Sequence, residues 1–259
     1  MKKAIVMISL GCRPWAATSF KTFEHYADKI GADAFLITED VWFDKFDISD
    51  VSEDFGRKNK RAYALKAYIP WEFMEQGYDK VLIVDDSCSV HPYAGSIFDE
   101  VPDNFVGYAK TSIKHAEISF AMIKDFQNEV AEAPVEFDPL HYANTGVVVY
   151  DRKQMDAISP DKIFRARSLL YNKYPHQTLM YYLMKKGSVP IKVIPKKFNI
   201  IPGLGLDKNA RRSLTSVSEY LDLDRIHIAH FTGAFRNREA LIVETADIFL
   251  QHWHKALGR

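Results

Sequence analysis

Three short, continuous apolar runs alternate with helical segments over the first 85 residues. The runs are KAIVMISL (3–10), ADAFLIT (32–38) and DKVLIVD (79–85). Between them, apolar residues recur at helical spacing over about 19–30 and 57–76. Uninterrupted apolar strands are typical of a sheet covered on both faces, and strands separated by helices join in parallel. The pattern therefore predicts an α/β fold with a central, mostly parallel (mixed) sheet flanked by helices.

The rest of the chain continues this pattern less regularly. Strands are expected at 104–110, 142–151, 189–194 and 225–231, and helices over about 113–130, 160–172, 175–187 and 237–257. Pro70 is expected to kink or restart the helix that contains it, because proline lacks the N–H of a helical hydrogen bond. No repeat or linker interrupts the chain, so we expect residues 1–259 to form a single domain.

Composition excludes several functional classes. Lysines and arginines equal aspartates and glutamates at 34 each, which argues against a nucleic-acid partner. The apolar runs are shorter than the roughly 18 residues that span a bilayer, so no transmembrane segment is expected. The start MKKAIVMISLGC looks like a secretion signal, but its apolar core is only about eight residues long. With two cysteines, Cys12 and Cys88, the chain is expected to be cytoplasmic.

Two acids and a serine end the third predicted strand. Asp85, Asp86 and Ser87 follow the apolar run directly, and ligands of open α/β sheets bind outside the carboxyl ends of the strands. Three classes of protein place acids there. A receiver domain is disfavoured because two strands precede the pair and Pro92 stands where a helix should begin. A phosphohydrolase is disfavoured because it needs a second acid in D-x-D, where this chain has Ser87.

The third class is a nucleotide-sugar transferase, whose strand-end acids hold a divalent cation. A sugar nucleotide leaves as a diphosphate, and a metal neutralises its charge while the glycosidic bond breaks. Oxygen ligands with an imidazole suit Mn²⁺ or Mg²⁺. This hypothesis predicts a histidine and basic residues elsewhere in the chain that approach the same diphosphate.

Later motifs supply such residues in order. They are KAYIPWEFMEQGYDKVLIVDDSCSVHPYAGSIFDEVP, YANTGVVVYDR, PHQTLMYYLMKKGSVPIKVIPKKFN and IAHFTGAFR. With these motifs the chain resembles glycosyltransferase family eight from about residue 60 to 236. That is the retaining GT-A group that includes bacterial lipopolysaccharide galactosyl- and glucosyltransferases and is related to glycogenin. The resemblance implies a GT-A fold. It also implies transfer of a hexose from a UDP-sugar, such as UDP-glucose or UDP-galactose, with Mn²⁺ or Mg²⁺. The acceptor, a glycan, a lipid-linked sugar or a protein, is left open.

The resemblance also implies roles for single residues. Asp85 and His230 match metal ligands, and Ser87 occupies the place of the second D-x-D acid, with Asp86 as the alternative ligand. Gly233 and Arg236 match a glycine and a basic residue at the donor diphosphate.

Three further positions match residues near the donor. Lys66 matches a basic residue that contacts the donor from the preceding helix. Asn144 matches the asparagine of N-x-G near the donor sugar. Gln177 matches a glutamine beside the anomeric carbon.

Departures from the family pattern keep a second hypothesis open. Ser87 and His176 each stand where the family has an aspartate, and SLGCRPW (9–15) lacks the acids that read the nucleoside. The alternative is a weakly active or inactive homologue that binds a nucleotide or a glycan. His230 could also be a buried core histidine, since it alternates with apolar neighbours.

Overall fold

The computed structural model describes most of the chain. The described residues are 1–11, 13–39, 60–110, 113–136, 138–171, 173–202, 216, 225–232 and 237–258. Gly233 and Arg236, which the family resemblance implies at the donor diphosphate, lie outside these residues, as does Cys12.

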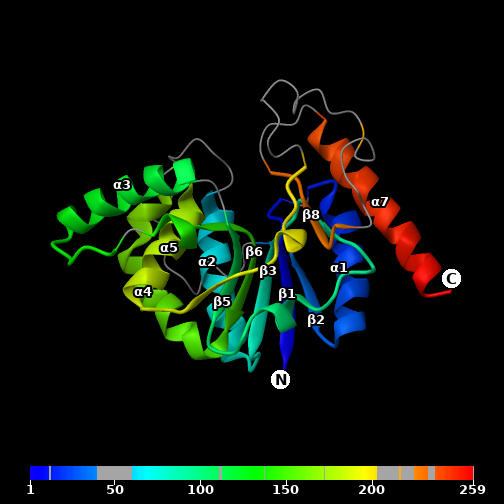
Figure 1. Ribbon diagram of the computed structural model, residues 1–259, viewed down its shortest axis with the longest axis horizontal. Helices are drawn as coiled ribbons and strands as arrows, with labels where there is room; N and C mark the ends of the chain where they lie inside the picture. Colours follow the sequence, from blue (N-terminus) through cyan, green and yellow to red (C-terminus); the bar gives the residue numbers. More distant parts are fainter. Residues whose placement is uncertain are drawn as a thin grey trace.

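A six-stranded sheet forms the centre of the molecule, in the order β2-β1-β3-β6-β5-β7 (Figure 1). Its strands are β1 (Lys3–Ile8), β2 (Asp33–Ile37), β3 (Lys80–Asp85), β5 (Val106–Lys110), β6 (Ala143–Asp151) and β7 (Ile191–Val193). Strand β1 is parallel to β2 and β3, and β7 is parallel to β5. Strand β6 runs antiparallel to both β3 and β5. The predicted flanked sheet is confirmed, and β6 makes it mixed.

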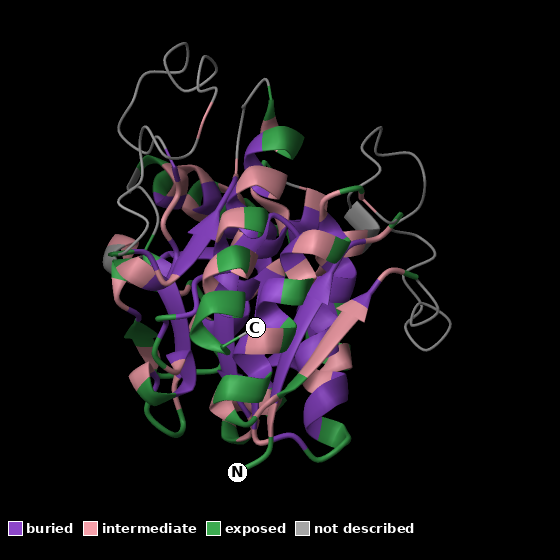
Figure 2. Cartoon of the chain, turned by 90° about the vertical axis from the view of Figure 1, so that its right-hand side faces the viewer, coloured by how far each residue is buried: buried purple, intermediate pink, exposed green. Residues whose placement is uncertain are grey.

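Helices cover both faces of this sheet. They are α1 (Ala16–Ile30), α2 (Lys60–Glu75), α3 (Ile113–Glu129), α4 (Pro160–Arg165), α5 (Pro175–Lys186) and α7 (Arg238–Ala256). Helices α1 and α7 pack together on one side, and α2 packs with α4 and α5 on the other (Figure 1). The inner strands β1, β3 and β6 are buried almost throughout, whereas the edge strands β2 and β7 are partly exposed (Figure 2).

Alternation along each strand divides the core in two. Val6 and Ile83 belong to the cluster beneath α2 and α5, whereas Met7 and Leu82 belong to the cluster with Phe23 of α1. Successive strand residues point to opposite faces, so a strand covered on both sides needs apolar residues at every position. This explains the uninterrupted apolar runs of the sequence.

Three local features differ from the expectations. Pro70 lies inside α2, which continues through it to Glu75 rather than restarting. The helix expected over 160–172 is the short α4 followed by a 3₁₀ helix, Arg167–Tyr171. Strand β4 (Cys88–Val90) was not predicted.

Strand β4 pairs antiparallel with β8 (Ile228–His230) in a small second sheet. Cys88 lies opposite His230 in this pairing. Because β4 begins three residues after the end of β3, the pairing carries His230 to the carboxyl end of the central sheet.

Candidate functional site

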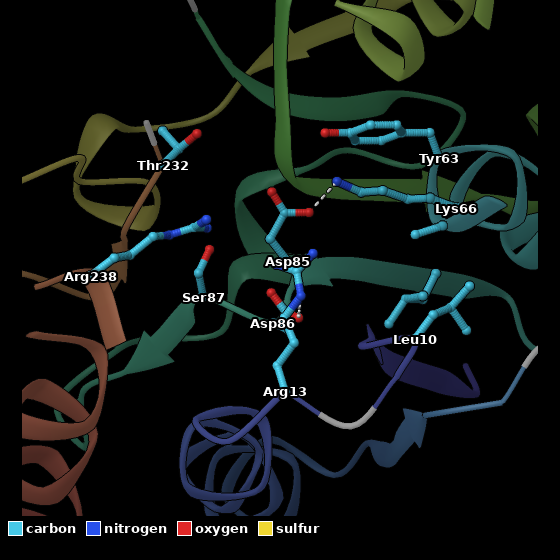
Figure 3. A pocket seen from close by; sticks show the side chains of 11 residues that line it. Leu10, Arg13, Tyr63, Lys66, Asp85, Asp86, Ser87, Thr232 and Arg238 are labelled. Atoms are coloured by element: carbon cyan, nitrogen blue, oxygen red, sulfur yellow. Dashed lines mark hydrogen bonds and ion pairs between the residues drawn. The ribbon is translucent and has the colours of Figure 1, made fainter. Parts of the chain in front are cut away.

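The carboxylate of Asp85 lies at the centre of the candidate site, at the carboxyl end of β3. Its Oδ1 is 2.5 Å from Nζ of Lys66, which projects from α2 (Figure 3). Its Oδ2 is 3.1 Å from Nε2 of His230, at the end of β8. The buried Lys66 ammonium also donates a hydrogen bond to the Thr145 carbonyl of β6. Residues of α2, β3 and β8 thus meet at one carboxylate.

The Lys66 ammonium keeps Asp85 ionised. Burial alone would raise the pKa of this carboxyl, but the neighbouring lysine charge outweighs burial and holds the pKa well below its ordinary value. An ionised carboxylate with 35% of its side chain exposed is available to a cation that enters the site.

The two residues after Asp85 point in different directions. The Ser87 hydroxyl is buried and has no hydrogen-bond partner among the described residues. Asp86 instead accepts a hydrogen bond from Ser9 at 2.9 Å and faces Nε of Arg13 at 3.4 Å. Burial raises the pKa of Asp86, and the Arg13 guanidinium partly opposes the rise. Asp86 is therefore engaged with the loop after β1, on the side away from Lys66 (Figure 3).

A cavity of about 310 Å³ opens above these acids. Lys66, Asp85, Asp86 and Ser87 line it, together with two arginines that the sequence analysis did not single out, Arg13 and Arg238.

The guanidinium carbons of these two arginines lie 5.5 and 5.7 Å from the centre of the Trp15 ring, and Arg238 Nε donates to the Phe231 carbonyl at 2.8 Å. Both side chains point into the cavity (Figure 3). Arg13 follows β1 at the same sheet edge as Asp85, a signal that could have identified it. No comparable signal marks Arg238 in the sequence.

Asn144 of β6 and Gln177 of α5 are not among the described residues that line this cavity. The Gln177 amide donates to the Ala143 carbonyl at 2.8 Å. Oδ1 of Asn144 accepts from the Gly146 N–H at 2.9 Å and from Nδ2 of Asn199 at 3.0 Å. Both predicted residues therefore make hydrogen bonds within the protein at the edge of the site.

His176, where the resembling family has an aspartate, is buried in α5 and packs against α2. Burial, and then the Lys66 charge, holds its pKa well below the ordinary value, so the ring is neutral. Pro70 leaves the Lys66 carbonyl without its usual helical donor. This carbonyl, near the ring, raises the pKa of His176, but by less than burial and the Lys66 charge lower it. Neither ring nitrogen reaches hydrogen-bond geometry with a described residue. His176 is thus a buried neutral residue and is not among the described residues that line the cavity.

The donor set around Asp85 fits one divalent cation. The described residues contain no group of three histidine, cysteine or acidic side chains that could hold a metal. Asp85 and His230 supply two such side chains, and their 3.1 Å contact lacks hydrogen-bond geometry, which leaves Nε2 without a partner. The Ser87 hydroxyl is a second buried polar atom without a partner. Carboxylate, imidazole and hydroxyl together suit Mn²⁺ or Mg²⁺, with room for oxygens of a bound ligand.

Comparison with known proteins identifies the fold. Neither a protein-family model nor a curated protein matches the sequence. Among solved structures, a glycosyltransferase involved in glycosylation of the major capsid of PBCV-1 matches with a TM-score of 0.59 and 12% identity. The match covers 96% of this chain and all of that one.

Two more solved glycosyltransferase structures match this chain over almost its whole length. The bifunctional glycosyltransferase WbbM matches with a TM-score of 0.56 and 17% identity, over 98% of this chain and about half (49%) of that one. The galactosyltransferase LgtC, solved with donor and acceptor sugar analogues, matches at 0.50 and 16%, over 97% and 95% of the two chains. The chain therefore has the GT-A fold of the glycosyltransferases, as its resemblance to family eight implies.

Proposed function

We propose that this protein transfers a hexose from a nucleotide diphosphate sugar to an acceptor, with a divalent metal and with retention at the anomeric carbon. The observation that carries the proposal is the Asp85 carboxylate, shared by Lys66 and His230 at the mouth of a cavity lined by two arginines. The fold match to a galactosyltransferase solved with donor and acceptor sugar analogues supports a sugar donor. Retention and a UDP-sugar rest on the family resemblance, and a single domain over residues 1–259 rests on the absence of a repeat or linker in the sequence.

In this proposal, Asp85, His230 and Ser87 hold Mn²⁺ or Mg²⁺. When bound, the metal would neutralise charge on the departing diphosphate. Lys66, Arg13 and Arg238 surround the cavity with positive charge fixed before the donor binds, and such charge favours the diphosphate as it leaves. Gly233 and Arg236 would add to this set. Gln177, held on β6 by the Ala143 carbonyl, is our candidate beside the anomeric carbon.

Release of nucleotide diphosphate tests this function. The protein is incubated with Mn²⁺ and a panel of sugar nucleotides, including UDP-glucose and UDP-galactose, and the released diphosphate is measured. We expect release from at least one donor, and none from His230→Ala. A matched control is Asp103→Asn, which alters an exposed acid paired with Lys80 at the far end of β3.

The rival function predicts a different result. Ser87 in place of a metal-binding carboxylate, and His176 in place of an aspartate, favour a homologue that binds nucleotide without turnover. If nucleotide diphosphate binds but no donor in the panel is consumed, with or without acceptor glycans, the chain is such a binding protein and the transferase proposal is wrong.

A further inference from the structure

The backbone N–H of Gly146 begins a chain of hydrogen bonds that ends at His230. This N–H donates to Oδ1 of Asn144 at 2.9 Å. A backbone N–H can only donate, so the oxygen of the Asn144 amide must face it, and this fixes which way the amide points.

The orientation of Asn144 in turn fixes Asn199. The same Asn144 oxygen accepts a second hydrogen bond, from Nδ2 of Asn199 at 3.0 Å. The other end of the Asn199 amide, Oδ1, then lies 2.9 Å from Nδ1 of His230. An amide oxygen can only accept, so Nδ1 of His230 must carry the proton. All three side chains are buried, with at most 8% exposed.

The consequence appears on the far side of the imidazole ring. With its proton on Nδ1, a neutral His230 presents the unprotonated Nε2 to Oδ2 of Asp85 at 3.1 Å. Two lone pairs then face each other across a gap that a cation would bridge. Metal-bound histidines usually donate their other ring N–H to such a partner, which fixes the tautomer.

The absence of a side chain at Gly146 leaves the space that the His230 ring occupies. A Cβ added there would lie 2.0 Å from Cε1 and 2.7 Å from Nε2 of His230. The ring therefore packs directly on the β6 backbone, between Gly146 and Asp85.

We infer that Asn144 and Asn199 are positioning residues, which hold His230 in the Nδ1–H tautomer so that Nε2 faces a metal shared with Asp85. This gives Asn144 a role other than contact with the donor sugar. We call these hydrogen bonds, from Gly146 through Asn144 and Asn199 to His230, the relay. Its purpose rests on the proposed metal-assisted function, but the tautomer of His230 does not.

The ring nitrogens of His230 test the relay directly. In ¹⁵N-labelled protein, two-bond ¹H–¹⁵N correlations distinguish the two neutral tautomers, and His230→Ala assigns the signal. We expect the Nδ1–H form in the wild type. Asn199→Leu removes the acceptor and should let the Nε2–H form appear, with Nε2–H donating to Asp85. Asn199→Asp keeps an acceptor for Nδ1–H and should keep the wild-type tautomer.

Metal binding gives the second readout. Mn²⁺ is titrated into each folded variant, alone and with UDP, and we expect Asn199→Leu to weaken binding by about 10–100-fold. Asn144→Leu should weaken Mn²⁺ binding in the same direction with no sugar present. An Nε2–H tautomer in the wild type overturns the relay, as does wild-type Mn²⁺ affinity in folded Asn199→Leu. If the wild type shows the Nδ1–H form but binds no Mn²⁺, the relay stands and the metal-assisted function fails.

Discussion

At the residue scale, Lys66 and His230 both contact the Asp85 carboxylate, and Lys66→Met tests how far the site depends on the lysine. Methionine keeps the buried stem and removes the ammonium, so the mutant should lose about 1.5–3 kcal/mol of stability, as for a lost hydrogen bond to a charged group. Binding of a nucleotide diphosphate should also weaken. Lys80→Met is the matched control, because Lys80 is equally buried at the other end of β3 and contacts Asp103. Equal diphosphate binding by both variants would mean that Lys66 is a structural lysine only.

The same variant gives a pH test. The folded-state pKa of Asp85 is depressed below its unfolded value of about 3.9. Its contribution to stability is therefore present above about pH 4 and lost as the pH falls further. In Lys66→Met the depression is smaller, so thermal unfolding between about pH 5 and pH 2 should show a shallower loss than in the wild type. Parallel curves for the two proteins would contradict the assignment.

Ser87 is the second residue-scale test. A hydroxyl brings no charge to a hard dication, so the free protein should bind Mn²⁺ weakly, and more tightly once a diphosphate adds its oxygens. Ser87→Asp should strengthen Mn²⁺ binding without donor by about tenfold, equivalent to about 1.4 kcal/mol. Titrations of wild type and mutant, with and without UDP, measure this. Equal affinities would show that position 87 does not face the metal.

At the element scale, strand β6 organises one side of the site. Ala143 and Thr145 accept hydrogen bonds from Gln177 and Lys66 through their carbonyls, and Gly146 supports His230. Gly146→Ala places a methyl group against the His230 ring, and such overpacking typically costs about 1–3 kcal/mol. We expect this loss together with weakened Mn²⁺ binding.

Gly95→Ala is the control for this variant, because a Cβ added at Gly95 meets nothing within 4 Å. Urea unfolding and Mn²⁺ titration of both variants decide the matter. If Gly146→Ala behaves like Gly95→Ala in both assays, the close packing of His230 on β6 is wrong.

Elements of this protein differ in how well sequence predicts them. The core strands were found within a few residues, because burial on both faces demands unbroken apolar runs. The pairing of β4 with β8 was not, because it joins two three-residue strands that are distant in sequence and too short for a periodic pattern. Asp85 and His230 were singled out and lie together. Asn199 and Arg238 were missed, since their roles depend on tertiary neighbours that no local pattern encodes.

At the scale of the whole molecule, the described residues contain no helix long and apolar enough to cross a membrane. The cavity lies where the carboxyl ends of β1 and β3 meet the β4–β8 pair, the usual ligand position in α/β sheets. Its walls come from both ends of the described chain, since Arg13 follows β1 and Arg238 opens α7. A ligand bound there should therefore stabilise the fold as a unit.

Thermal unfolding with a nucleotide diphosphate sugar and Mn²⁺ tests the central claim most directly. A ligand at about 100 times its dissociation constant adds about 2.7 kcal/mol, which for a chain of this size raises Tm by about 5–10 °C. We predict this rise for the wild type when sugar nucleotide and Mn²⁺ are both present, and a smaller rise with either alone. In His230→Ala, adding Mn²⁺ should give no further rise in Tm. If no sugar nucleotide in a broad panel shifts the transition, with or without Mn²⁺, the pocket at Asp85 is not a donor site.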